Sequence, residues 1–108
     1  LPFSSKDIAI LVANAFENAI HASSNQNQTH QEILISAKFD NDKLAIVIKN
    51  RFDGDVLLGH NGFPTTDKPG HGIGISSILS IVKKYNAFAN CSHKDGWFNM
   101  TFLFTNNT

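Results

Sequence analysis

Residues 11–22 read Leu11-Val12-Ala13-Asn14-Ala15-Phe16-Glu17-Asn18-Ala19-Ile20-His21-Ala22, and they form the most informative stretch of the chain. The apolar character of this run begins upstream at Ile8, and its length and spacing predict one long helix. Ser4 or Ser5 can cap the start of the helix, and the polar segment 23–28 predicts its end.

Four polar side chains share one stripe of this predicted helix. They recur at positions i, i+3, i+4 and i+7: Asn14, Glu17, Asn18 and His21. Such a stripe is often only the solvated face of an amphipathic helix. Asn is a poor residue for a helix interior, however, and amide oxygens on one face can bind a hard cation such as Mg²⁺ together with phosphates. The residues alone leave both interpretations open.

Two hairpins are predicted downstream. Alternating apolar residues on either side of the turn Asp40-Asn41-Asp42 predict a hairpin over 31–50. A second hairpin has strands over 88–94 and 97–104. In its last strand four large apolar side chains share one face: Phe98, Met100, Phe102 and Phe104. We expect that face in the core, because Phe is usually buried.

Between the hairpins, segment 51–72 is rich in Gly and Pro and has no periodicity. A loop of this length is uncommon in a small domain and is usually functional. A second helix follows, with apolar residues at helical spacing from Ile75 to Tyr85. The order of elements predicts an α+β fold, a two-layer sandwich with both helices packed on one face of a mixed, mainly antiparallel sheet.

The run Lys68-Pro69-Gly70-His71-Gly72-Ile73-Gly74 leads directly into this second helix. Glycines at alternate positions leave the backbone N–H groups accessible, and a helix start adds unpaired donors and partial positive charge, so the run can bind phosphate. Lys68 can add a full positive charge. Glycine-rich loops often only turn the chain, and that interpretation stays open. Asn50, at the end of a predicted strand, can likewise reach a ligand base or only cap a turn.

The composition fits one compact domain of 108 residues. Nine basic and nine acidic residues cancel, so we expect no global attraction to nucleic acid or to an anionic membrane. Cys91 is the single cysteine, which excludes an internal disulfide and favours a reducing cytosol. No apolar run approaches the roughly 20 residues of a membrane span. Because the chain starts at Leu1 without Met, we expect it to be a fragment of a longer protein.

Taken together, these motifs resemble those of a known family. Residues 11–22 resemble the N box of histidine kinases, usually written L-x-N-x-x-(D/E)-N-A-(I/V)-x-A. Residues 70–75 resemble their second glycine box, and 76–86 resemble the helix that follows it. The order fits the ATP-binding superfamily of gyrase, histidine kinases and the mismatch-repair MutL proteins, known as the GHKL or Bergerat fold. The resemblance covers nearly all of residues 1–108, and the chain looks most like the branch of quorum-sensing peptide receptors.

The resemblance implies a function and a set of site residues. The domain would transfer the γ-phosphoryl group of ATP to a His on a separate dimerisation domain of its own homodimeric protein, with a cognate response regulator as a further partner. Asn14 and Glu17 would form the catalytic wall, and Asn14 and Asn18 would hold Mg²⁺ and the phosphates. The remaining nucleotide contacts would come from His21, Lys68, Gly70, His71, Gly72, Ile73 and Gly74.

Two departures from the family pattern matter. Superfamily members that hydrolyse ATP carry Glu at the position of Asn14 to activate water, so the chain resembles a kinase more than a gyrase-like or MutL-like ATPase. The first glycine box is normally D-x-G-x-G, with the Asp reading adenine. Here Asn50 is the candidate for that role and Asp53 the reserve.

Two alternatives remain from different functional classes. One is a serine kinase of the anti-sigma-factor type, and the other is a nucleotide-binding module that transfers no phosphate. We expect the fragment to be inactive without its phosphoacceptor domain. We also expect it to be a cytoplasmic part of a membrane-anchored sensor, without insertion into the membrane and without nucleic-acid binding.

Overall fold

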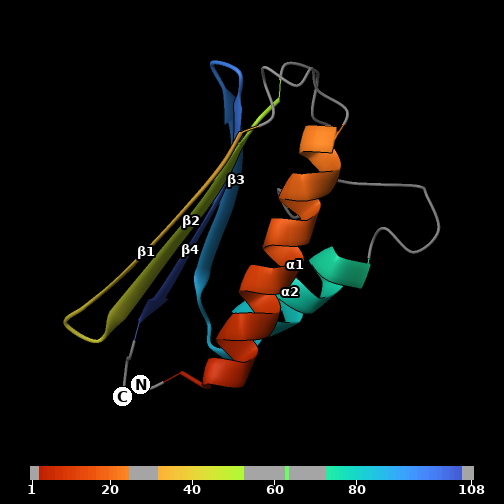
Figure 1. Cartoon of the computed structure of the whole chain (residues 1–108). Helices are drawn as coiled ribbons and strands as arrows, with labels where there is room; N and C mark the ends of the chain where they lie inside the picture. Colours follow the sequence, from red (N-terminus) through yellow and green to blue (C-terminus); the bar gives the residue numbers. More distant parts are fainter. Residues whose placement is uncertain (1–2, 25–31, 53–62, 64–72, 106–108) are drawn as a thin grey trace.

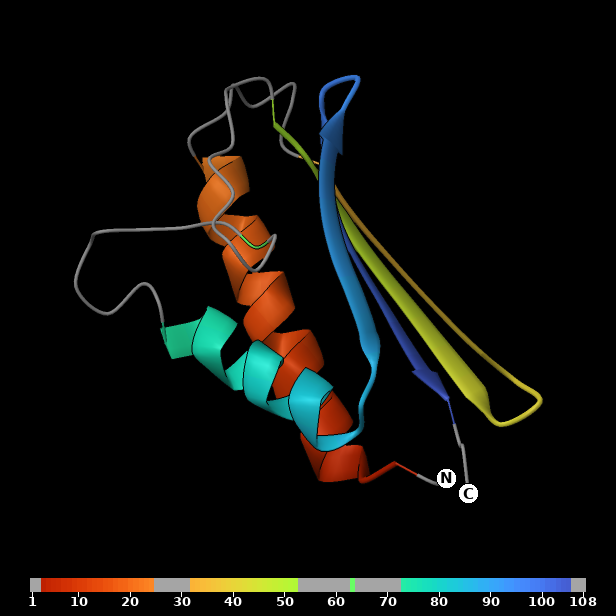
Figure 2. The same cartoon turned by 180° about the vertical axis from the view of Figure 1, so that it is seen from behind.

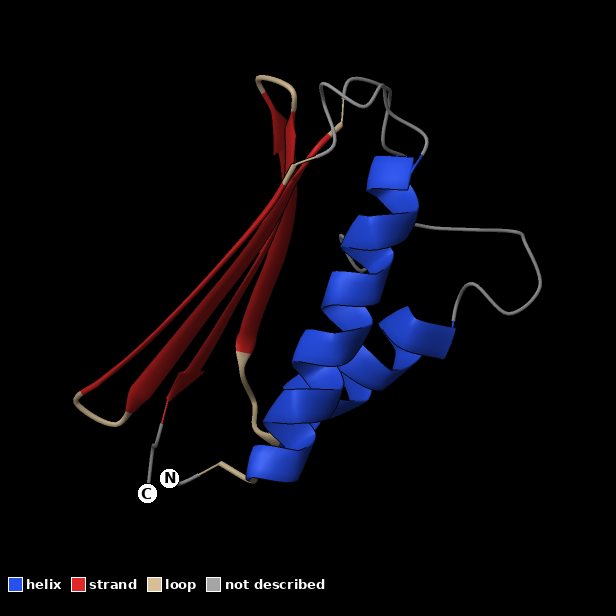
Figure 3. Ribbon diagram, in the orientation of Figure 1, coloured by secondary structure: helices blue, strands red, loops and turns tan. Residues whose placement is uncertain are grey.

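The computed structural model describes residues 3–24, 32–52, 63 and 73–105. In this part of the chain the elements follow one another in the expected order (Figure 1). They are α1 (Ser5–Ser24), β1 (Ile33–Asp40), β2 (Lys43–Arg51), α2 (Ile73–Lys84), β3 (Phe88–Lys94) and β4 (Trp97–Thr105). The predicted α+β architecture is confirmed, because the two helices form one layer and the sheet forms the other (Figure 3).

The sheet has the order β1-β2-β4-β3. Its three described pairings are all antiparallel, so the mainly antiparallel character is confirmed and no parallel pair occurs among these strands. Strands β2 and β4, which lie in the centre, join the two sequence-local hairpins into one sheet through the register Ile46↔Phe102. This central pairing brings the Phe-rich strand beneath the helices.

Both hairpin turns have two residues, and all four positions have positive φ. The values are 52° and 63° at Asn41 and Asp42, and 55° and 79° at Asp95 and Gly96. This is the geometry of type I′ turns, whose twist matches that of the flanking strands, and Asn, Asp and Gly tolerate it best. The turn residues therefore fix the register of each hairpin.

The helix α2 ends through a left-handed residue. Asn86 has a φ of 52°, and the N–H groups of Asn86 and Ala87 donate to the carbonyls of Lys83 and Val82 at 3.2 and 2.8 Å. This is the Schellman pattern of helix termination, in which Asn can replace the usual Gly. The helix begins at Ile73, inside the glycine-rich run and earlier than residue 76.

The core lies between the helices and one face of the sheet. The predicted apolar face of the last strand is buried, since Phe98, Met100, Phe102 and Phe104 are all at most 3% exposed. From the long loop, Phe63 is also buried and stacks on Phe102 with ring centroids 6.4 Å apart. Burial raises the pKa of the Cys91 thiol to about 12, so this cysteine is a protonated core residue at neutral pH.

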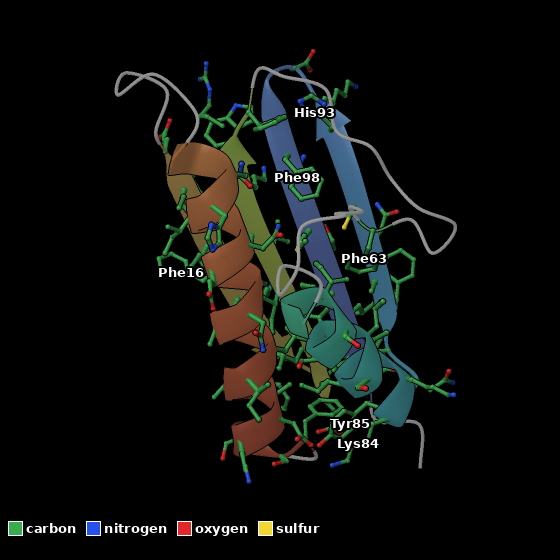
Figure 4. All side chains as sticks on the ribbon, turned by 90° about the vertical axis from the view of Figure 1, so that its right-hand side faces the viewer. Phe16, Phe63, Lys84, Tyr85, His93 and Phe98 are labelled. Carbon is green, nitrogen blue, oxygen red and sulfur yellow. The ribbon has the colours of Figure 1, made fainter. Side chains whose placement is uncertain are left out.

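The edge strand β1 is much less covered than its neighbours. Its burial pattern contains no buried residue, and Leu34, Ile35 and Phe39 are all close to half exposed. Helix α1 packs mainly against β2 and α2. Phe16, which is 39% exposed, projects from the side of α1 that faces away from α2 (Figure 4). The alternating pattern of β1 therefore predicts its strand correctly but not its burial.

The first turn of α1 is fastened to the end of α2. Lys84 Nζ forms an ion pair with Asp7 Oδ2 at 2.7 Å, and the Tyr85 hydroxyl donates to the same oxygen. The Tyr85 oxygen also accepts a hydrogen bond from the backbone N–H of Ser4. These hydrogen bonds, from Lys84 first and then Tyr85, lower the pKa of Asp7 below its ordinary value of 3.8. The fastening lies where the last turns of α2 cross the first turns of α1 (Figure 2).

Candidate functional site

The polar stripe of α1 divides into two halves in the structure. Asn14 and Asn18 are partly buried, whereas Glu17 and His21 are exposed. The geometry of the helix explains this division. Asn14 and Asn18 lie on successive turns of α1 and nearer to its apolar side, which packs on the sheet. Exposure of Glu17 and His21 agrees with a solvated face, but the half-buried amides require polar partners.

Asn14 has such partners in its own helix and at the start of α2. Its Nδ2 donates to the carbonyl oxygen of Ile10 at 2.9 Å, which fixes the direction of the carboxamide. A Cβ atom placed on Gly74 would lie 3.3 Å from Asn14 Oδ1. The amide oxygen therefore faces the first turn of α2. At position 74, any side chain larger than that of glycine would press against this oxygen.

The beginning of α2 supplies the second constellation. Ile73 is the first helical residue and Gly74 the second, so the glycine-rich run does lead directly into a helix start, as predicted. Unpaired N–H groups at such a start favour an anion. No acidic side chain lies in the first turn of α2 to oppose one. Lys68, Gly70, His71, Gly72 and the reserve residue Asp53 lie outside the described residues.

Asn50 is the single buried polar side chain in the described part of the chain, at 1% exposure. It continues the buried face of β2 after Leu44, Ile46 and Ile48, so its amide points to the helix layer. Its Nδ2 donates to the carbonyl of Arg51 at 3.3 Å. Burying an amide on an apolar face costs free energy unless it is well bonded, which makes this position unusual for a purely structural residue.

Asn50 lies near the end of the molecule where α1 finishes, whereas the Asn14–Gly74 contact lies near the middle of α1. The end of β2, which carries Asn50, lies at the same end of the sheet as the last turns of α1 (Figures 1 and 2). Asn18 lies one turn beyond Asn14 in that direction. The structure thus brings Asn14 and Gly74 together, with Asn18 one turn along the same helix, and it places Asn50 on the sheet face that α1 covers.

Sequence reasoning missed a set of contacts where β2 ends. The N–H of Phe52 donates to the carbonyl of Gly96 at 2.9 Å, and His93 Nε2 donates to the carbonyl of Phe52 at 2.7 Å. The Arg51 guanidinium lies over the Trp97 ring at 5.2 Å. No local pattern indicates these contacts, because they join β2 to the second hairpin. In the sequence His93 stands out only as a histidine without metal-ligand spacing.

Comparison with known proteins shows which family this chain matches. Residues 3–105 match the family model described as the GHKL domain. The histidine kinase AdeS of Acinetobacter baumannii has a similar structure with a TM-score of 0.67 and 15% identity, over 95% of this chain and 47% of that one. Two nucleotide-free forms of the catalytic domain of histidine kinase ThkA give TM-scores of 0.71 and 0.72 with 16% and 19% identity.

The match to ThkA covers 95% of this chain and 68% of each ThkA chain, so the present chain spans only part of these proteins. No curated relative matches it in sequence. At such low identity the solved structures show a common fold, and the family model covers almost the whole chain. The chain therefore belongs to the GHKL domain family.

Proposed function

We propose that this chain is the ATP-binding catalytic domain of a sensor histidine kinase, which donates the γ-phosphoryl group of ATP to a His on a separate dimerisation domain. The contact between the Asn14 amide oxygen and the Gly74 position carries the proposal, because it joins the polar stripe of α1 to the start of α2. Membership of the GHKL family and the fold shared with histidine kinase catalytic domains support it.

The donor set near Asn14 fits Mg²⁺ bound to a nucleotide. Mg²⁺ takes oxygen ligands and keeps several waters and phosphate oxygens, so one or two protein oxygens are enough. The oxygen of Asn14 has a fixed direction, because the nitrogen of the same amide bonds to Ile10. Asn18 supplies a second half-buried amide one turn away. When bound, Mg²⁺ would neutralise charge on the phosphates, while the N–H groups at the start of α2 bind phosphate oxygens.

The residue at position 14 favours phosphoryl transfer over hydrolysis. An amide cannot accept a proton from water at neutral pH, so Asn14 cannot act as a general base. Glu17 lies on the same helix but is exposed, and its role is to line the phosphate wall together with His21. Catalysis then depends on positioning and charge neutralisation, as is usual for phosphoryl transfer.

At the other side of the site, Asn50 reads the adenine base. Its buried amide, aimed at the helix layer from the end of β2, is suited to exchange a hydrogen bond with the adenine amino group. The larger protein is a homodimeric, membrane-anchored sensor of the quorum-sensing type with this domain in the cytoplasm, and it passes phosphate to a response regulator. Neither described helix is long and apolar enough to cross a membrane.

Calorimetric titration with Mg-ATP tests the proposal. We expect weak binding, on the order of micromolar to millimolar, that requires magnesium and is lost or strongly reduced in Asn18→Ala. Asn90→Ala, an exposed change on β3, is the matched control and should bind like the wild type. Equal and magnesium-independent binding by the wild type and Asn18→Ala would contradict the site.

The same preparations test the reaction. With γ-labelled ATP the fragment alone should neither label itself nor release much phosphate. His21, the one histidine in the two described helices, is assigned to the nucleotide site, and position 14 carries no carboxylate. Addition of a protein that carries the His-bearing dimerisation helix should produce labelled histidine on that partner. Stable labelling of a histidine in the fragment, or brisk hydrolysis, would favour another function.

A further inference from the structure

We propose that His93 is a positioning residue of the nucleotide site, which ties the end of β2 to β3 and so holds Asn50 in place for the base. The proposal rests on the function proposed above, and it adds a residue that the motifs of the family resemblance do not include. His93 lies near the end of β3, on the strand farthest from β1, and Figure 4 shows it at the same end of the sheet as Phe98.

The contacts of Phe52 show how the tie is built. The last pair of the β2–β4 register is Arg51↔Trp97, so Phe52 is the first residue beyond the ladder. Its N–H donates to Gly96 O at 2.9 Å, and its carbonyl accepts from His93 Nε2 at 2.7 Å. The Phe52 and His93 rings also meet edge to face, with centroids 5.8 Å apart. Both polar groups of the Phe52 backbone are thus held by the second hairpin.

The strand register places His93 in the same cross-strand row as Asn50, the residue proposed to bind the adenine base. Asn50 is opposite Phe98 on β4, and Phe98 is opposite His93 on β3. Directly opposite residues of an antiparallel pair lie on the same face, so all three belong to the face that carries the helices. The His93 side chain therefore extends across Phe98 toward β2, the strand that carries Asn50. It bonds to Phe52, which lies two residues after Asn50.

The chemistry of the imidazole suits a permanent tie. A carbonyl oxygen can only accept, so Nε2 must carry a proton in this contact. His93 thus acts as the hydrogen-bond donor in this contact.

Loss of the tie should affect binding more than folding. His93 is exposed on an edge strand, so its removal leaves the core intact. Without the tie, the Phe52 backbone keeps the hydrogen bond to Gly96 but loses the one that its carbonyl accepts. Ordering this strand end on binding would then reduce the affinity for nucleotide, as expected whenever a site is less preorganised.

Titration with Mg-ADP and melting curves on the same proteins test this role. We expect His93→Ala to raise the Kd about three- to tenfold, the range that one neutral hydrogen bond accounts for, with little change in Tm. His93→Gln should recover most of the affinity, because its amide N–H can replace the imidazole donor. Asn90→Ala, on the opposite face of the same strand, should match the wild type in both measurements.

Asn50→Leu separates this inference from the proposed function. If Asn50→Leu weakens binding and His93→Ala does not, the tie has no positioning role and the proposed function stands. Equal losses in His93→Ala and His93→Gln would also overturn the role of His93 as a donor. A folded wild type without affinity for nucleotide would overturn both proposals. Weakened binding in His93→Ala that is restored in His93→Gln, together with weakened binding in Asn50→Leu, supports the tie.

Discussion

At the scale of single residues, helix propensity and side-chain packing make opposite demands on position 74. Its place in the first turn of α2 favours alanine by helix propensity, with about 1 kcal/mol to gain. Its place against Asn14 requires the absence of a side chain, because a Cβ would lie 3.3 Å from Asn14 Oδ1 and force that amide to shift.

The variant Gly74→Ala should therefore change stability and binding in opposite directions. We expect a Tm equal to or above that of the wild type, from up to about 1 kcal/mol of helix propensity, together with weaker binding of Mg-nucleotide. Melting curves and calorimetry on the same protein check this. Ser76→Ala, an exposed change in the same helix, controls for propensity and should leave the affinity unchanged. Binding by Gly74→Ala equal to that of the wild type would show that the Asn14 amide needs no such space.

At the scale of elements, the crossing of α1 and α2 is held at two places. One is the Asn14–Gly74 contact, and the other is the group formed by Asp7, Lys84 and Tyr85. Phe3 adds an edge-to-face contact with Tyr85 and packs on Phe104, which joins this group to the core. The polar fastening is largely exposed at Lys84, so its contribution to stability is screened by solvent.

The pH dependence of stability reports this fastening. The pKa of Asp7 is lowered in the folded state, chiefly by the hydrogen bond from Lys84, so its contribution is complete above 3.8 and is lost as the pH falls through the lowered pKa. The pKa of Lys84 is raised by Asp7, so its share persists up to pH 10.5 and declines above it. The Tm difference between wild type and Asp7→Asn should be constant near neutral pH and shrink as the pH falls below 3.8. A difference that does not depend on pH would contradict this origin.

At the scale of the whole molecule, burial is distributed unevenly across the sheet. The helices cover β2 and β4, whose inner faces are buried, while β1 at the edge exposes apolar residues on both faces. Phe39 and Phe102 are both aromatic residues on the helix-facing side of the sheet, since each is in register with a residue of that face on β2. Phe39 is nevertheless 45% exposed and Phe102 fully buried.

This difference predicts unequal costs for the same substitution. Phe102→Ala should lower the free energy of unfolding by about 3–5 kcal/mol, because it leaves a cavity in the core. Phe39→Ala should cost about 1 kcal/mol or less, since much of its ring already contacts water. Urea denaturation of both variants checks the prediction. Similar losses would mean that β1 is covered in solution.

Local structure followed from the sequence because near neighbours determine it. The turn residues Asn41-Asp42 and Asp95-Gly96 accept positive φ, so both hairpins could be placed along the chain. The register came from the structure, in which Asp40 belongs to the ladder, paired with Lys43, and not to the turn. The apolar face of the last strand likewise predicted which of its residues lie in the core. The resemblance of residues 11–22 and 70–75 to the kinase boxes then identified the GHKL family, which the family model confirms.

Only the tertiary structure decided how far the polar residues are buried and what they contact. The stripe on α1 looked uniform in the sequence, yet packing against β2 and α2 leaves Asn14 and Asn18 half-buried and Glu17 exposed. The bond from His93 to Phe52 joins residues 41 positions apart, and no local pattern encodes such a contact. Apolar alternation identified β1 as a strand, but whether a strand is covered depends on where the helices dock. The physical reason is common to all three cases: conformation is set by adjacent residues, whereas burial and side-chain partners arise from contacts that exist only after the elements pack.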